Sequence, residues 1–120
     1  MESKDYAIYV VAWQKRLASE EQERKKLREE AYQVARHGAR LLKDKFGVKK
    51  VYLFGSLLSD DFFWELSDID LLIEGLSSRK YFQAVSKLQD LSSFKIDLIM
   101  KEDCPKDWLK NMGALEELDG

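Results

Sequence analysis

The sequence predicts an α/β (α+β) fold in which a small sheet is flanked by helices and preceded by an N-terminal helical arm. The first observation is that residues 4–46 contain no proline and only one glycine, Gly38, while their apolar residues recur at helical spacing. The second is that short apolar runs typical of buried strands follow, separated by helical patterns. Strands that alternate with helices are typical of an α/β architecture.

The arm is predicted over residues 1–46. Its apolar residues are Tyr6, Val10, Trp13, Leu17, Leu27, Ala31, Val34, Gly38 and Leu41. The stretch from Ser19 to Gln22 has the pattern of a capping box, which favours two helices that meet near Ala18, with one long helix as the alternative. Core packing is the simplest role for Trp13. Gly47, just past Lys43 and Lys45, is predicted to end the arm.

The remaining elements are predicted in the order strand, short helix, strand, helix, strand, helix. The strands are Val48–Phe54, a run that begins near Ser67 and includes Leu71–Ile73, and Phe94–Met100; the helices are a short one after Ser56, Arg79–Leu91, and one from Pro105 to about Leu118. The last helix is expected to bury Trp108, Leu109, Met112 and Leu115.

Length and composition predict a single domain, 1–120, with a core at 48–118. The longest apolar run, Ala7–Trp13, is far shorter than the roughly 20 residues that a membrane-spanning helix needs. Without a signal peptide and with one cysteine, Cys104, we expect a cytoplasmic protein. Residues 1–50 carry 13 Lys/Arg and 8 Asp/Glu, whereas residues 51–120 carry 7 and 14. The chain is thus not uniformly basic, and we expect no direct nucleic-acid partner.

Chemistry is predicted where the first strand ends. Gly55 and Ser56 form a strand-to-helix turn, in which a glycine lets the backbone approach a ligand and the first helical amides can bind phosphate oxygens. Asp68 and Asp70 lie two residues apart in a strand, so their carboxylates point to the same side. Gly-Ser is also a common turn, and Asp70 could lie exposed at a strand edge.

Asp97 is the acidic residue in the middle of the strand Phe94–Met100. If this strand pairs beside the one that holds Asp68 and Asp70, three carboxylates converge and can hold two Mg²⁺ ions. That arrangement predicts phosphoryl or nucleotidyl transfer.

These motifs, Leu-Phe-Gly-Ser, Ser-Asp-Ile-Asp-Leu-Leu-Ile and Ile-Asp-Leu-Ile, resemble those of the minimal nucleotidyltransferases of the DNA polymerase β superfamily, over residues 48 to about 112. The resemblance includes the antitoxins encoded beside HEPN toxins. It implies a mixed sheet, Gly55 and Ser56 at the triphosphate of ATP, Asp68 and Asp70 as ligands of two Mg²⁺ ions, and Asp97 as a ligand and catalytic base. It also implies transfer of AMP to a tyrosine of a HEPN-type toxin partner.

Two further roles remain open: a catalytically silent antitoxin that acts by binding, and a nucleotidyltransferase subunit for a small-molecule acceptor. The loop 57–67 contains acidic residues and no basic one, so the triphosphate is expected to rely on Mg²⁺, on backbone amides, or on Lys49, Lys50, Arg79 or Lys80. Phe62–Trp64 in this loop either cover the core or form an aromatic patch for adenine or a partner. Part of the arm is expected to contact another chain or a second copy, because the core is too small to cover it.

Overall fold

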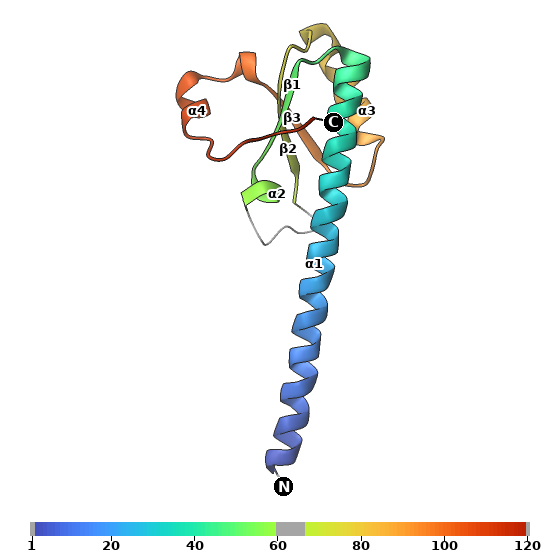
Figure 1. Ribbon diagram of the computed structural model, residues 1–120, viewed down its shortest axis with the longest axis vertical. Coiled ribbons are helices and arrows are strands. Elements are labelled where there is room, and N and C mark those ends of the chain that lie inside the picture. The colour runs from blue at the N-terminus through green and yellow to red at the C-terminus, as the bar shows by residue number, and fades with distance from the viewer. Residues whose placement is uncertain (1, 60–66, 120) are drawn as a thin grey trace.

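The computed structural model describes residues 2–59 and 67–119, with side chains from residue 7 onward except those of residues 56 and 59. The C-terminal half of a long helix, α1 (Glu2–Phe46), lies against a small sheet, and its N-terminal half extends away from that sheet (Figure 1). The C-terminal end of the chain lies beside the half of α1 that contacts the sheet. The longest dimension is 70 Å, which the helix accounts for.

Helix α1 is continuous over its 45 residues, so the prediction of two helices meeting near Ala18 was wrong. The capping pattern at Ser19 is not used as a helix start, because no proline or glycine interrupts the helix there and each further residue adds a hydrogen bond without a new nucleation cost. The predicted end is confirmed: α1 stops at Phe46, and Gly47 has a φ of 68°.

Four strands form one mixed sheet in the order β3-β2-β1-β4, which confirms the predicted fold class. They are β1 (Lys50–Phe54), β2 (Ile69–Glu74), β3 (Ile96–Met100) and β4 (Glu116–Glu117). Strand β1 is antiparallel to β2 and β4, whereas β2 and β3 are parallel. The helices between them are α2 (Ser56–Ser59), η1 (Ser78–Lys80), α3 (Tyr81–Gln89), η2 (Lys101–Asp103) and α4 (Lys106–Lys110).

The core lies between one face of the sheet and the helices α1 and α3 (Figure 1). Helix α1 contributes Ala31, Ala35 and Ala39, whose small side chains let the helix approach the sheet closely. Alternate strand residues such as Leu53 and Leu71 meet them, all fully buried. The residues between these, such as Asp70, therefore point to the opposite face of the sheet.

The C-terminal segment differs from the prediction of one helix to Leu118. Helix α4 ends at Lys110, Gly113 follows with a φ of 84°, and the chain then pairs with β1 as β4. Trp108 and Leu115, expected to be buried, are 40% and 42% exposed. Pairing with the free edge of β1 satisfies backbone groups, as in the 2.8 Å bond from the Leu118 amide to the Val51 carbonyl, and this outweighs the helical pattern.

The first half of α1 also differs from the core role expected for its apolar residues, because Trp13 is 62% exposed. Core packing by α1 begins only near Leu27, which is partly buried against the core. None of the described helices combines the length and the apolar composition that a membrane span needs.

Candidate active site

Three carboxylates meet on the face of the sheet away from α1. Strands β2 and β3 pair in a register that sets Asp70 beside Asp97, and Asp68 lies just before β2. One carboxylate oxygen from each of the three residues lies within 4.8 Å of the others. The structure therefore brings together all three acidic residues that the sequence pattern singled out.

The start of β3, just before Asp97, is fixed by the side chain of Gln89 at the end of α3. Its amide nitrogen donates to the carbonyl of Phe94 at 3.1 Å, and its oxygen accepts from the amide of Ile96 at 2.9 Å. The amide of Ile69 donates to the carbonyl of Lys95 at 2.8 Å, which joins the starts of β2 and β3. Backbone and side-chain bonds thus hold both acidic strands in register.

Gly55 packs directly against this acidic group. Its φ is 79°, a conformation that side-chain-bearing residues rarely adopt. A Cβ at this position would overlap the Oδ2 atom of Asp70 and lie 3.1 Å from its Cγ. The predicted close approach of backbone at Gly55 is therefore present, and the neighbour that requires it is the carboxylate of Asp70.

Burial and mutual repulsion make two of the carboxylates hard to ionise. Burial, reinforced by the charges of Asp97 and Asp68, raises the pKa of Asp70 to about 6. Burial and the hydrogen bond and charge of Asp68 raise the pKa of Asp97. Lys95, whose Nζ lies 3.9 Å from an Asp68 oxygen, opposes this, but its side chain is 70% exposed and the pair is weak.

The donor set fits a hard divalent cation. Carboxylate oxygens are the protein ligands that Mg²⁺ prefers, and three of them converge here with their negative charge only weakly compensated. A cation between them would remove the repulsion that raises the pKa of Asp70. Asp68, Asp70 and Asp97 are thus the residues that would hold the metal.

This repulsion predicts that the metal-free protein is stabilised by Asp70→Asn. The folded pKa of Asp70 lies above its unfolded value of 3.8, so ionisation destabilises the fold as the pH rises and the cost is complete above about pH 6. We expect the variant to be more stable at pH 7 in chelator by about 1–2 kcal/mol, after allowance for solvent screening.

The measurement is urea unfolding of both proteins in chelator between pH 4 and pH 7. The difference in unfolding free energy should shrink as the pH falls towards 4, because the native carboxyl is then neutral. A variant that is less stable than the wild type at pH 7 would contradict the repulsion.

The other predicted phosphate ligands are not all placed at the site. Ser56 begins α2, directly after Gly55, but its side chain lies outside the described part of the structure. Lys50 pairs with Glu74, at the end of β1 away from Asp70, and Lys49 adjoins it. Arg79 and Lys80 follow that same end of β2. The positions of these four basic residues therefore do not support the prediction that they hold the triphosphate. Phe62–Trp64, predicted either to cover the core or to form an aromatic patch, lie outside the described residues.

The site is bordered by an aromatic pair, which the sequence pattern did not indicate. Phe54 is the cross-strand partner of Asp70, so both side chains project from the same face of the sheet. Trp108 of α4 packs edge-on against Phe54, with ring centroids 6.2 Å apart. The signal for Phe54 was available in the strand alternation, whereas Trp108 lies in a helix that was predicted to start after Pro105 but whose contact with Phe54 was not predicted.

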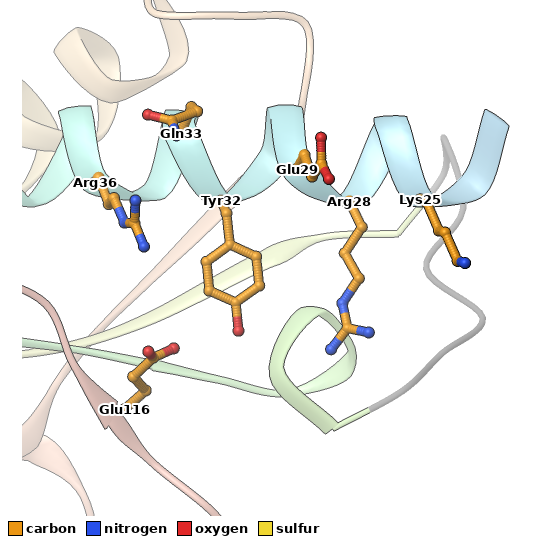
Figure 2. A pocket seen from close by; sticks show the side chains of 7 residues that line it. All are labelled: Lys25, Arg28, Glu29, Tyr32, Gln33, Arg36 and Glu116. Atoms are coloured by element: carbon orange, nitrogen blue, oxygen red, sulfur yellow. The ribbon is translucent and has the colours of Figure 1, made fainter. Parts of the chain in front are cut away.

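A hollow of about 550 Å³ lies on the other side of the sheet, between α1 and β4 (Figure 2). Glu116 lines it and pairs with Leu53, which faces α1, so the hollow and the three carboxylates are on opposite faces. Arg28, also in its lining, donates through Nε to the carbonyl of Leu57 at 3.1 Å and through Nη2 to that of Leu58 at 3.2 Å. This side of the molecule therefore anchors α2, the helix that follows Gly55, to α1.

The chain's one cysteine and one histidine lie outside the acidic group. Cys104 donates to the carbonyl of Met100 at 3.4 Å, and burial with the nearby charges of Asp103 and Glu102 raises the pKa of its thiol, which disfavours the nucleophilic thiolate. His37 is exposed on α1, away from the acidic group.

The fold and the site together define a class of enzyme. A mixed sheet presents three carboxylates from neighbouring strands, beside a strand–glycine–helix turn. Such a site is suited to transfer of phosphoryl or nucleotidyl groups with the aid of a divalent cation.

Comparison with known proteins gives the family. The family described as Polymerase beta, Nucleotidyltransferase matches residues 39–115. The chain is 34% identical over 91 residues to the "Putative protein adenylyltransferase MJ1217" of Methanocaldococcus jannaschii, across 73% of this chain and 90% of that protein. MJ0128 of the same organism, with the same description, is 32% identical over 87 residues, across 70% of this chain and 86% of its own length. The chain belongs to the polymerase β nucleotidyltransferase family, and most of α1 lies outside the matched residues.

Proposed function

We propose that the protein is a Mg²⁺-dependent adenylyltransferase that transfers AMP from ATP to a hydroxyl group of a partner protein, and that this partner is a HEPN-type toxin which the transfer neutralises. The observation that carries the proposal is the convergence of Asp68, Asp70 and Asp97 within 4.8 Å beside Gly55. The names of the relatives, which describe protein adenylyltransferases, support the choice of donor and acceptor class.

The proposed reaction is an in-line displacement at the α-phosphorus of ATP. The hydroxyl oxygen of the partner forms a bond to that phosphorus, the bond to the bridging oxygen breaks, and pyrophosphate leaves. The hydroxyl proton passes to the carboxylate of Asp97, which projects from the open face of the sheet beside Asp70. Mg²⁺, held as two ions by the three aspartates, would neutralise phosphate charge and favour departure of pyrophosphate.

The nucleotide would approach along the open face of the sheet. The first turn of α2, which follows Gly55, offers amides to the phosphates, although a four-residue helix supplies only a small part of the binding. Phe54 and the exposed Trp108 supply aromatic surface next to Asp70 that adenine can contact.

A separate acceptor protein suits the size of the domain. Among the described residues no second lobe covers the acidic face of the sheet, so acceptor specificity would come from a partner. A partner of this kind can present a tyrosine hydroxyl to Asp97 from the open side.

The experiment is to purify the protein with the chain that co-purifies with it, add ATP and Mg²⁺, and follow the intact mass of both chains. We expect the partner to gain the mass of one or more AMP groups, with release of pyrophosphate. Chelator should prevent the gain, and peptide mapping should place the AMP on a hydroxyl side chain. AMP found only on a small molecule would replace the protein acceptor with a small-molecule one.

A catalytically silent antitoxin is the second candidate. It is favoured by the distance of Lys49 and Lys50 from the acidic site and by the lack of a basic residue in the loop 57–67. Neutralisation of the partner with no mass gain and no pyrophosphate release would support this candidate and contradict transfer.

A further inference from the structure

Residues 7–23, in the N-terminal half of α1, form an exposed apolar segment, and the word arm below refers to these residues alone. Every residue in it except Val10 is exposed, and Figure 1 shows it extending away from the sheet. Ile8, Tyr9 and Trp13 are 67%, 75% and 62% exposed. Of the nine exposed large apolar residues in the described chain, five lie in one stretch of ten residues, 8–17. This is a concentration of apolar surface rather than the usual scatter of single residues.

The arm is a poor helix when alone in water. Its apolar end contains β-branched and aromatic residues, Ile8 to Val11 and Trp13, which have only moderate helix propensity. Most helical stability in proteins comes from packing of an apolar face, and here no described segment of the same chain supplies it. Contact of this apolar surface with another molecule would therefore stabilise the helix.

The surface to be covered continues the face that packs against the sheet. Trp13 precedes the buried Ala31 by 18 residues, which is about five turns of an α-helix, so the two lie on the same side. Leu17 precedes the buried Ala35 by the same interval. Val10, Trp13 and Leu17 repeat at intervals of three and four, the spacing of a coiled-coil seam.

This geometry restricts how a second copy can lie along the seam. A parallel second helix would run along the seam towards Ala31, on the side where the sheet of the first copy lies, and would collide with it. An antiparallel second helix places the two sheets at opposite ends. The seam of the arm thus accepts a second copy only in the antiparallel direction.

Charge selects the antiparallel register. In the first register, the two-fold axis that relates the copies lies between Val11 and Ala12. Val10 of one copy then lies against Trp13 of the second, so apolar residues fill the seam. Tyr9 lies beside Arg16 of the second copy, where a cation can contact an aromatic ring. A shift of one heptad, centred on Lys15, would set Arg16 beside Arg16 and Val10 against Glu20.

The next shift, centred between Ala18 and Ser19, would require Ala31, which is fully buried against its own sheet. Of these three registers only the first combines an apolar seam with no opposition of like charges at Arg16.

We propose that the arm is a homodimerisation element, in which two copies of this chain pair antiparallel through Val10, Trp13 and Leu17 and hold two nucleotidyltransferase domains at opposite ends of a rod. The inference is independent of the proposed reaction, because residues 7–23 lie outside the family match.

Disulfide trapping tests the direction and register of the pairing. Cys104 is the one cysteine in the sequence, so Cys104→Ser gives a background for single cysteines. Chains with Val10→Cys and chains with Trp13→Cys are mixed and oxidised. We expect mixed disulfide dimers to exceed homodimers of either chain by about tenfold, because the seam places position 10 opposite position 13.

Equal or greater yields of the two homodimers would contradict the antiparallel register.

Light scattering on the full chain tests the assembly itself, with two variants that differ only in the face they change. Val10→Glu places a carboxylate in each half of the seam and should weaken association by about 100-fold or more. Lys15→Glu, on the opposite side of the helix, introduces the same residue and should leave the mass unchanged. A wild-type protein that is monomeric at about 100 μM, well above the Kd of a stable dimer, or equal effects of the two variants, would overturn the proposal.

Discussion

Asp97→Asn should lower the rate of AMP transfer by about a thousandfold, because it removes the proposed proton acceptor and a metal ligand together. Asparagine keeps the size of the side chain, and Asp97 lies on the open face of the sheet rather than in the core, so the fold should remain intact. The measurement is the initial rate of AMP incorporation into the partner with ATP and Mg²⁺. Circular dichroism and the melting temperature check the fold.

The matched control is Asp44→Asn, which removes an exposed carboxylate on α1, 71% exposed and in a weak pair with Arg40. It should transfer AMP at the wild-type rate. The double variant Asp68→Asn with Asp70→Asn should also abolish transfer and should lose the difference in ATP binding between Mg²⁺ and chelator. An Asp97→Asn variant that keeps a tenth or more of the wild-type rate would exclude Asp97 as the catalytic base.

The acidic group was predictable from sequence because its parts obey short-range rules. Asp68 and Asp70 share a face through the two-residue period of a strand, and Asp97 interrupts an otherwise apolar alternation. Only the pairing of the two strands was a long-range assumption, and the parallel register of Asp70 with Asp97 bears it out. Gly55 followed from the turn, but its neighbour, the carboxylate of Asp70, could be identified only in three dimensions.

The wrong predictions share one physical cause. A local sequence pattern does not show which other interaction in the folded chain competes with the structure that it predicts. The pattern at Ser19 resembles a helix start, yet a helix already formed continues through it. Leu115 and Leu118 fit a helical interval, yet their segment forms β4 because the edge of β1 offers hydrogen bonds. Trp13 fits a core stripe, yet the sheet does not extend far enough to cover it.

The basic residues show the same limit. Lys49 and Lys50 lie close to Gly55 in sequence, but a strand carries them away from it at about 3.3 Å per residue. Proximity in sequence therefore suggested that these lysines lie at the same end of β1 as Gly55. The pairing of Lys50 with Glu74 shows that they lie at the opposite end.

Gly55→Ala should lower the rate of AMP transfer by about 100-fold or more while the partner remains bound, and so it separates neutralisation by AMP transfer from neutralisation by binding alone. The added Cβ would overlap Oδ2 of Asp70 and crowd its Cγ at 3.1 Å, so the carboxylate must rotate out of the acidic group. The positive φ of 79° adds backbone strain of about 1–2 kcal/mol. Because the clash falls on the end of a side chain, the protein should still fold, with transfer reduced by about 100-fold or more.

Gly113→Ala is the control for strain, since its φ of 84° is similar and a Cβ there would meet nothing within 4 Å. Both variants should lose similar stability in urea, but only Gly55→Ala should lose transfer. The deciding measurement is toxicity of the partner in cells that express each variant, with the complex recovered by affinity purification. Toxicity restored by Gly55→Ala in an intact complex means that neutralisation requires the chemistry. Protection by Gly55→Ala without AMP on the partner would mean that binding alone neutralises it, as expected of the catalytically silent antitoxin.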